Sequence, residues 1–368
     1  MVNLELDAEQ LEVAELGRQL GLEVLSPVAR EAEERRGVPE GVWRTLFETG
    51  LTVPVPEELG GAGIGDTVTL MVALENLSYG DPGIVFAAYS SGVAAMLLAR
   101  HGGPERAALV RGLTSDPTAR GAVALYEGQG RGAAEFATVI HTTDDGRIRV
   151  RGHKTAVAFG ADADPLVVVG TDERSGAVRA VLVPRDTDGI TVKAYDGGLA
   201  LDAARTAAMS FDVTVPAENL LDAEDLLTTL GRIRLGVAAI ALGTAWRAID
   251  YAAEYATERV AFGRPIAAFQ GVSFPLAEAQ MRITQARLET LDLAARLHDP
   301  DAADLTAAIS RLLAHVGETA AEATRAAVQT LGGHGFIAEH PVELWYRSAM
   351  ALSALDFDPL CSSFTPAL

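Results

Sequence analysis

Three long segments in the second half of the chain carry apolar residues at intervals of three and four positions. This is the period of an α-helix that buries one face. The segments cover residues 226–259, 270–298 and 301–331, and a shorter one follows at 341–355. Glycine and proline residues separate them and act as stop signals. Because each helix must bury its apolar face against others, the four segments predict a four-helix bundle.

The first part of the chain also follows the helical period. Asp7 and Gln10 have the spacing of a capping box, and the helix that they begin is expected to run to about Arg36. Further helices are expected at 40–48, 66–79 and 84–101. These patterns predict an N-terminal helical domain over residues 1–120.

Residues 121–222 have a different texture. Short β-branched or alternating runs are separated by turn signals such as Ser175-Gly176, and this pattern is typical of strands. The runs lie at 148–150, 165–169, 180–183 and 190–192. They predict a small, mostly antiparallel β-domain, with the bundle domain following over residues 223–368.

The charge of the chain excludes several classes of partner. There are 50 acidic and 30 basic residues, and the formal net charge is −20. A field of this sign repels phosphates, so we expect neither nucleic acid nor a membrane surface as a partner. The single cysteine, Cys361, excludes an internal disulfide. The longest apolar run, 235–246, is too short to span a bilayer, and no signal peptide pattern is present, so we expect a cytoplasmic protein.

Four short motifs follow one another along the chain: 56–63 (PEELGGAG), 258–270 (ERVAFGRPIAAFQ), 329–336 (QTLGGHGF) and 341–347 (PVELWYR). With these motifs and its order of helices, strands and helices, the chain resembles the acyl-CoA dehydrogenase family over essentially its whole length. The resemblance implies that family's fold, which is mainly α with a β insert. It also implies an acyl-CoA substrate, an FAD cofactor, an electron acceptor and a tetramer with each FAD between two subunits.

The flavin cradle of the family is degraded in this chain. Where the family has a T-E-P-x-x-G-S-D type of segment, residues 126–133 read YEGQGRGA, without the threonine, serine and aspartate. Where the family has W-I-[TS]-N-[GA], residues 156–160 read AVAFG. The hydrogen-bond donors and the stacking ring are lost together. We therefore expect that this subunit does not bind FAD tightly in its own cradle.

The residues that contact the neighbouring subunit's FAD in the family are present. They are Arg259, Phe262, Gln270, Gln329, Gly332 and Gly333. An arginine can pair with a pyrophosphate through two hydrogen bonds, and adjacent glycines allow a close backbone approach. A degraded site beside an intact contribution to the neighbour's site is what a subunit would show if it served a partner's flavin.

The catalytic base of the family is a glutamate that takes the α-proton while the flavin accepts the β-hydride. Asp356 stands at the matching place, with a side chain one methylene shorter. Some relatives place the base at a position that matches Ile233, so no base is expected there, and the adjacent Arg234 is a candidate substrate contact. We expect Asp356 to be a helix-end residue rather than the working base.

The favoured prediction is the non-catalytic partner in a heteromeric acyl-CoA dehydrogenase. It is similar to the degenerate subunit of actinobacterial α₂β₂ enzymes that act on CoA thioesters of steroid side chains. Its partner would be a homologous acyl-CoA dehydrogenase subunit. Two alternatives stay open: a self-sufficient homotetrameric FAD enzyme with Asp356 as the base, and a non-redox acyl-CoA-binding protein.

Overall fold

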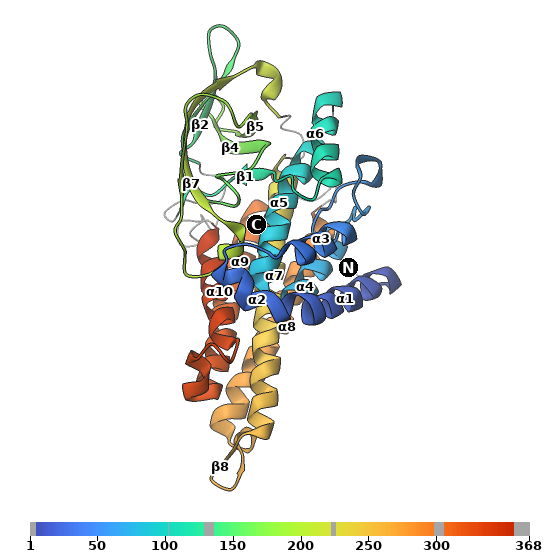
Figure 1. The fold of residues 1–368 in the computed structure, drawn as a ribbon, viewed down its shortest axis with the longest axis vertical. Coiled ribbons are helices and arrows are strands. Elements are labelled where there is room, and N and C mark those ends of the chain that lie inside the picture. Colours follow the sequence, from blue (N-terminus) through green and yellow to red (C-terminus); the bar gives the residue numbers. More distant parts are fainter. Residues whose placement is uncertain (1–4, 102, 129–135, 222–225, 298–304, 357–368) are drawn as a thin grey trace, which may run out of the picture.

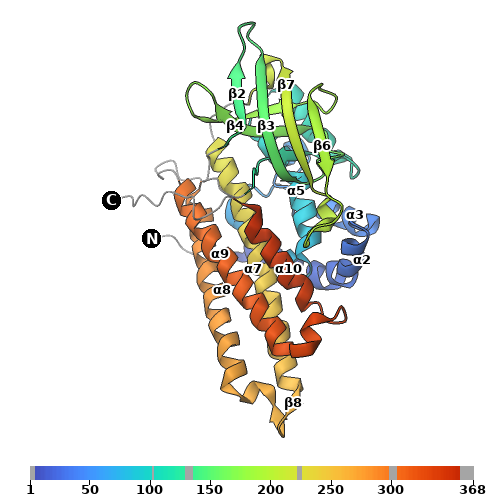
Figure 2. The same ribbon diagram turned by 90° about the vertical axis from the view of Figure 1, so that its left-hand side faces the viewer.

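Four long helices form the lower part of the molecule in Figures 1 and 2. They are α7 (Leu226–Glu258), α8 (Gln270–Arg296), α9 (Thr306–Leu331) and α10 (Val342–Leu355). α7 packs against each of the other three, which confirms the predicted bundle. The computed structural model describes residues 5–101, 103–128, 136–221, 226–297 and 305–356. The expected start of the third long helix, at 301–304, lies outside these residues.

The N-terminal domain is helical, as predicted. Its helices are α1 (Ala8–Leu20), α2 (Ala29–Glu34), α3 (Glu40–Thr49), α4 (Thr67–Ser78), α5 (Pro82–Arg100) and α6 (Pro104–Ser115). The capping box at Asp7 and Gln10 is present. The single helix expected up to Arg36 is wrong: π-helical and 3-10 turns over residues 21–28 separate α1 from α2. Pro27 lies in this break and has no amide hydrogen to continue an α-helix.

The β-domain contains one sheet of seven strands among the described residues. They are β1 (Ala122–Ala124), β2 (Val139–Thr142), β3 (Ile148–Val157), β4 (Leu166–Asp172), β5 (Val178–Val183), β6 (Ile190–Ala194) and β7 (Ala207–Val215). β4 pairs in parallel with β1 and β2, and the other pairs are antiparallel. The sheet is therefore mostly antiparallel, as predicted, and it packs at the upper end of α5 and α7 (Figure 1). The exact domain limits stay a prediction.

The helices α5 and α7 form the centre of the molecule. Both are long and apolar enough to cross a membrane, but 89% of each apolar window is buried inside the protein, as in core helices of soluble proteins. They cross closely where Tyr89 of α5 lies against Gly236 of α7. A Cβ atom on Gly236 would lie 2.4 Å from the Tyr89 ring. This contact fixes the spacing of the two helices just below the sheet.

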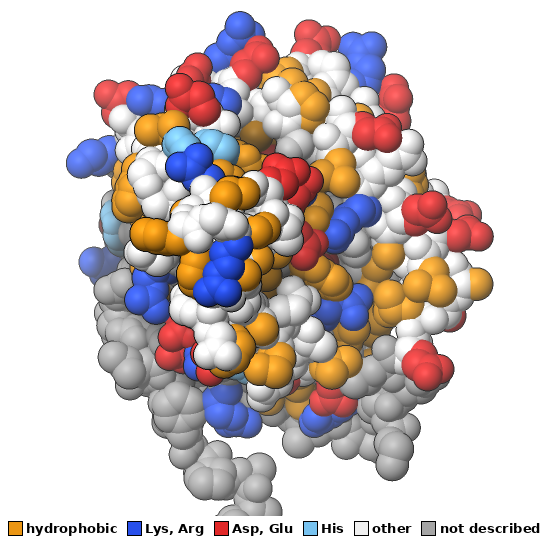
Figure 3. All heavy atoms as spheres, turned by 90° about the horizontal axis from the view of Figure 1, so that it is seen from below, with side chains coloured by type: hydrophobic (Ala, Val, Ile, Leu, Met, Phe, Trp, Pro, Cys, Tyr) orange, Lys and Arg blue, Asp and Glu red, His pale blue; other side chains and the backbone are white. Residues whose placement is uncertain are grey.

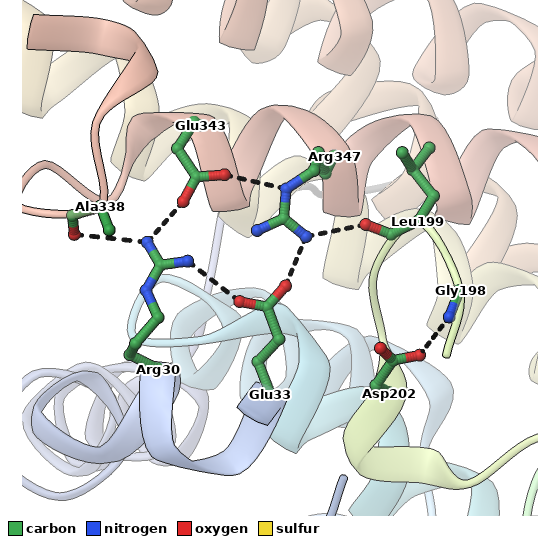
Figure 4. A network of polar contacts seen from close by, with 8 residues as sticks. All are labelled: Arg30, Glu33, Gly198, Leu199, Asp202, Ala338, Glu343 and Arg347. Carbon is green, nitrogen blue, oxygen red and sulfur yellow. Dashed lines mark hydrogen bonds and ion pairs between the residues drawn. The ribbon is translucent and has the colours of Figure 1, made fainter. Parts of the chain in front are cut away.

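A ring of four charged side chains joins the three domains (Figure 4). Arg30 and Glu33 of α2 alternate with Glu343 and Arg347 of α10, so that each charge has two opposite neighbours. Arg347 also donates to the carbonyl oxygen of Leu199 in the segment before β7, at 2.7 Å. The ring holds α10, which Asp356 directly follows, against the N-terminal domain and the β-domain.

Asp81 caps the N-terminus of α5 beside this ring. Its Oδ1 accepts a hydrogen bond from the amide of Ile84 at 2.7 Å. Burial raises the pKa of the Asp81 carboxyl from 3.8 to about 6, with the hydrogen bond from Ile84 acting in the opposite direction. Folding therefore takes up a proton between these values, and the stabilisation present at low pH is lost as the pH rises through the folded pKa.

We expect the free energy of unfolding to fall by about 1 kcal/mol from about pH 5 to about pH 7.5 because of Asp81. Asp81→Asn should remove this slope, since asparagine keeps the cap without a charge. Asp81→Ala should also lack the slope. Its free energy of unfolding should be about 1 kcal/mol below that of Asp81→Asn at each pH, because the amide of Ile84 loses its acceptor. Urea unfolding across this range measures both effects. Parallel pH profiles for the wild type and Asp81→Asn would contradict the assignment.

Candidate active site

A small apolar cavity lies where α5, α7 and the β-domain meet. Its volume is about 40 Å³. The wall includes Tyr89 from α5, Ile233 from α7 and Tyr126, just after β1. Ala156 and Ala158 complete it from the end of β3. These alanines occupy the places where the sequence resemblance implied a stacking ring and a hydroxyl, so this cavity is where the chain's own flavin site would be.

Asp356 lies at the end of α10 and forms a buried ion pair with Arg234 of α7. The two residues are 8% and 4% exposed. The Arg234 Nε–H is 2.9 Å from Oδ2 and 3.3 Å from Oδ1 of Asp356. Arg234 Nη2 also donates to Ser310 Oγ of α9 at 3.1 Å, so that the pair joins three helices of the bundle.

This ion pair involves both the candidate base, Asp356, and the candidate substrate contact, Arg234. Both carboxylate oxygens of Asp356 lie within hydrogen-bonding distance of the Arg234 Nε–H, so the carboxylate at the matching base position is already engaged by a protein group. The same contacts occupy Arg234, the candidate substrate contact, with other protein groups.

Phe159 does not replace the missing aromatic ring of the cradle. Its ring packs edge-on against Trp43 of α3, with the ring centroids 5.9 Å apart. The guanidinium groups of Arg120 and Arg205 lie 5.6 and 5.5 Å from its ring centroid. The backbone of Phe159 is left-handed, with φ at 53°, an unusual conformation for a bulky residue.

The segment 126–133 is described only up to Gly128, so the rest of the degraded cradle lies outside the described residues. Glu127, within the described part, forms a buried ion pair with Lys154 of β3, with Nζ and Oε1 2.7 Å apart. Lys154 also donates to the carbonyl oxygen of Leu125 at 3.0 Å. The Glu127 carboxylate accepts hydrogen bonds from the amides of Ala137 and Thr138. The pair thus anchors both flanks of the cradle segment.

Burial lowers the pKa of Lys154 to about 8, against the opposing effect of Glu127. Burial opposes ionisation of Glu127 too, but Lys154 and the hydrogen bonds outweigh it and leave the pKa of this carboxyl lowered. This ion pair was not predicted from the sequence. A signal was available, because the alternation of β3 places Lys154 on the same face as the buried Ile148 and Val150.

The residues expected to serve a neighbour's flavin gather at one end of the bundle. Arg259 directly follows α7, Phe262 lies in the hairpin of β8 (Val260–Ala261) and β9 (Arg264–Pro265), and Gln270 begins α8. Gln329 lies in the last turn of α9. Gly332 and Gly333 follow in the 3-10 helix η7 (Gly332–Phe336).

Hydrogen bonds from two tyrosines of α7 hold the segment after α9 beside this end of the helix. Tyr255 Oη is 2.8 Å from His334 Nδ1, and Tyr251 Oη is 2.7 Å from His340 Nδ1. Because Tyr255 lies one turn before Arg259, the glycine segment is placed next to the end of α7 that carries this arginine.

This end of the bundle is open to solvent. Arg259, Gln270, Gln329 and Gly333 are exposed, and the Phe262 side chain is 96% exposed. Figure 3 views the molecule from this end and shows hydrophobic side chains among arginine and lysine side chains. Further exposed apolar residues of the region are Val260, Phe274, Phe336 and Ile337. An apolar surface of this kind, with polar groups around it, is typical of a protein interface.

A larger cavity of about 440 Å³ lies elsewhere, between α3 and the segments beside β1 and β4. Its wall includes Trp43, Arg44, Arg120, Asp162 and Arg205, and it shares no lining residue with the small cavity beside Ala156 and Ala158. Its size alone does not make it the reaction site.

Family models match all three parts of the chain. They are the acyl-CoA dehydrogenase N-terminal domain at residues 7–111, the middle domain at 126–214 and the C-terminal domain at 224–356. The chain therefore belongs to the acyl-CoA dehydrogenase family, whose members are FAD-dependent oxidoreductases. The family resemblance inferred from the motifs and the predicted fold class are confirmed.

Individual relatives agree with this assignment. A probable acyl-CoA dehydrogenase of Bacillus subtilis is 31% identical over 95% of this chain and 94% of the relative. The mitochondrial short-chain specific acyl-CoA dehydrogenase of Sus scrofa is 31% identical over 88% of this chain and 81% of the relative. The butyryl-CoA dehydrogenase structure from Megasphaera elsdenii superposes with a TM-score of 0.83 at 27% identity, covering 98% and 97% of the two chains.

The residues of the chain's own flavin site and the exposed residues around Arg259 differ in how well they fit FAD. Small-molecule sites commonly enclose about 300–1,000 Å³, far above the space beside Ala156 and Ala158. The described part of the chain's own site therefore does not fit a flavin ring as it stands. The exposed group around Arg259 does fit a role toward FAD, since an accessible arginine and a glycine pair suit a pyrophosphate.

Proposed function

We propose that this chain is a subunit of a heteromeric acyl-CoA dehydrogenase, in which it completes the FAD site of a homologous partner. The observation that carries the proposal is a contrast within one chain. The residues suited to a neighbour's flavin are exposed at the end of the bundle, whereas the described residues of the chain's own site enclose only a small cavity. FAD, when bound in the partner, supplies hydride acceptance, and this chain supplies contacts that hold it.

Each exposed residue has a defined task in this proposal. Arg259 can bind the pyrophosphate through charge-assisted hydrogen bonds. Gly332 and Gly333 let the backbone approach the cofactor closely. Phe262 and the apolar residues around it exclude water from the subunit interface. The ring of Arg30, Glu33, Glu343 and Arg347 supports this surface, since Arg30 also donates to the Ala338 carbonyl oxygen after η7.

The paired state of Asp356 supports placing the proton abstraction in the partner. A catalytic carboxylate must be free to take the α-proton of the acyl thioester. Asp356 is held by Arg234, so the base would come from the partner subunit. The substrate class is an acyl-CoA thioester, and the resemblance to α₂β₂ enzymes favours a bulky acyl group of the steroid side-chain type. We propose an electron-transferring flavoprotein as the electron acceptor.

The central experiment compares the chain purified alone with the chain co-expressed with a homologous acyl-CoA dehydrogenase subunit. We expect the chain alone to be colourless. We expect the complex to absorb at about 450 nm and to contain about half an FAD per chain. The visible spectrum and the native mass are the two readouts. A yellow homotetramer with one FAD per chain would instead support the self-sufficient enzyme. A colourless complex would support the non-redox acyl-CoA-binding protein.

Arg259→Ala should weaken FAD retention by the complex by roughly tenfold or more, since a charge-assisted hydrogen bond contributes about 1.5–3 kcal/mol. The measurement is the FAD left on the complex after dilution, followed by flavin fluorescence. Arg282→Ala is the matched control, because Arg282 is also a solvent-accessible arginine of the bundle and forms an ion pair with Glu322. Equal FAD retention in the two variants would count against a role of Arg259 toward the partner's flavin.

A further inference from the structure

Tyr126 is a buried residue in the wall of the chain's own cavity. It stands where the family's cradle segment begins with threonine, and it lines the cavity together with Ala156 and Ala158. The side chain is buried, and its phenol lies within electrostatic reach of Asp356, Arg234 and Tyr89. Burial, followed by the charge of Asp356, raises the pKa of Tyr126, which keeps the phenol neutral and suited to an apolar interior.

Tyr89 lines the same cavity as Tyr126. It is fully buried on α5, and its ring lies against Gly236 of α7. Its hydroxyl donates to the carbonyl oxygen of Arg232 at 3.2 Å. The helix crossing and this hydrogen bond together hold the Tyr89 ring in the cavity wall. The two tyrosines and Ile233 therefore share the space beside the two alanines.

Among the described residues, little space remains beside the two tyrosines. Beside the cavity of about 40 Å³ there is a second one of about 20 Å³, lined by Leu125, Phe136, Leu230 and Arg234. Alanine at 156 and 158 should have enlarged the site, since both residues are smaller than the tryptophan and threonine of the family pattern. The cavity that the described residues line is nevertheless small, and its wall includes the side chains of Tyr89, Tyr126 and Ile233.

We propose that Tyr126 is the residue that closes this chain's own cavity to a flavin ring, so that the subunit folds and assembles without a cofactor of its own. This rests on the proposed function, because it explains why FAD occupies only the partner's sites. Arg234 completes the closed site, because it binds the carboxylate of Asp356, the residue that matches the family's base position. A phenol ring, two helices and an internal ion pair then replace the contacts that a bound flavin makes.

The test uses the isolated full-length chain and lumiflavin, the flavin ring without its ribityl phosphate arm. This probe is chosen because it does not need the donors missing from 126–133. Binding is followed by quenching of lumiflavin fluorescence. We expect no saturable binding to the wild type or to Tyr126→Phe, which keeps the ring. Tyr126→Ala should show saturable lumiflavin binding, since removal of the phenol ring enlarges the cavity beside Ala156 and Ala158.

Circular dichroism checks that each variant is folded, and Tyr126→Leu replaces Tyr126→Ala in the titration if the alanine variant unfolds. The proposal is overturned if the wild type binds lumiflavin as tightly as the variant, or if a folded variant gains no binding. This titration needs no partner subunit. Its failure is therefore distinct from failure of the proposed function, which is decided by the flavin content of the co-expressed complex.

Discussion

Lys154→Met is expected to lower the free energy of unfolding by about 3–5 kcal/mol, the cost of removing one partner of a buried ion pair. The Glu127 carboxylate would stay buried with its negative charge and keep only the amide hydrogen bonds of Ala137 and Thr138. The carbonyl oxygen of Leu125 would lose a donor as well. Because these contacts anchor the cradle segment, the loss should also loosen the sheet around β3.

Urea unfolding followed by far-ultraviolet circular dichroism measures this loss. The double variant Lys154→Met/Glu127→Leu should recover most of the stability, since no charge is then left buried. Arg149→Met is the matched control on the same strand, because Arg149 pairs with Asp212 in a solvent-accessible position. Such pairs contribute about 0–1 kcal/mol. A loss for Lys154→Met no larger than for this control would show that the buried pair does not stabilise the domain.

Arg234→Met should destabilise the bundle by a similar amount, about 3–5 kcal/mol, because it leaves Asp356 without its cation. The end of α10 and the contact with Ser310 on α9 would be weakened together. Thermal or urea unfolding measures the effect. Arg296→Met is the control, since Arg296 forms an ion pair with Asp292 that is accessible to solvent.

The double variant Arg234→Met/Asp356→Leu separates the structural role of the pair from a catalytic one. It should recover much of the lost stability and assemble with the partner subunit. If the partner supplies the base, the complex should keep its wild-type dehydrogenation rate despite the loss of the carboxylate. A folded, flavin-containing complex without activity would show that Asp356 is the base after all.

The helical parts of the fold could be predicted where the apolar pattern was long. The bundle helices and α3, α4 and α5 follow from periodicity, and Gly50 ends α3 in a left-handed conformation that glycine adopts at low cost. The helix α6 was missed because it buries only Val110 and Leu113 and so has no strong apolar stripe. β1 and β2 were missed because three or four residues are too few to show an alternation.

By itself the sequence determined the family of this protein, the order of its domains and the loss of hydroxyl groups and an aromatic ring from its flavin cradle. These properties depend on residue types and spacing along the chain. Only the tertiary structure decided what replaced the lost groups: Tyr126 in the cavity, Lys154 beneath the cradle and Arg234 against Asp356. Arg234 and Asp356 are 122 positions apart in the sequence. Their pairing depends on how α7 and α10 pack, and no local pattern encodes it.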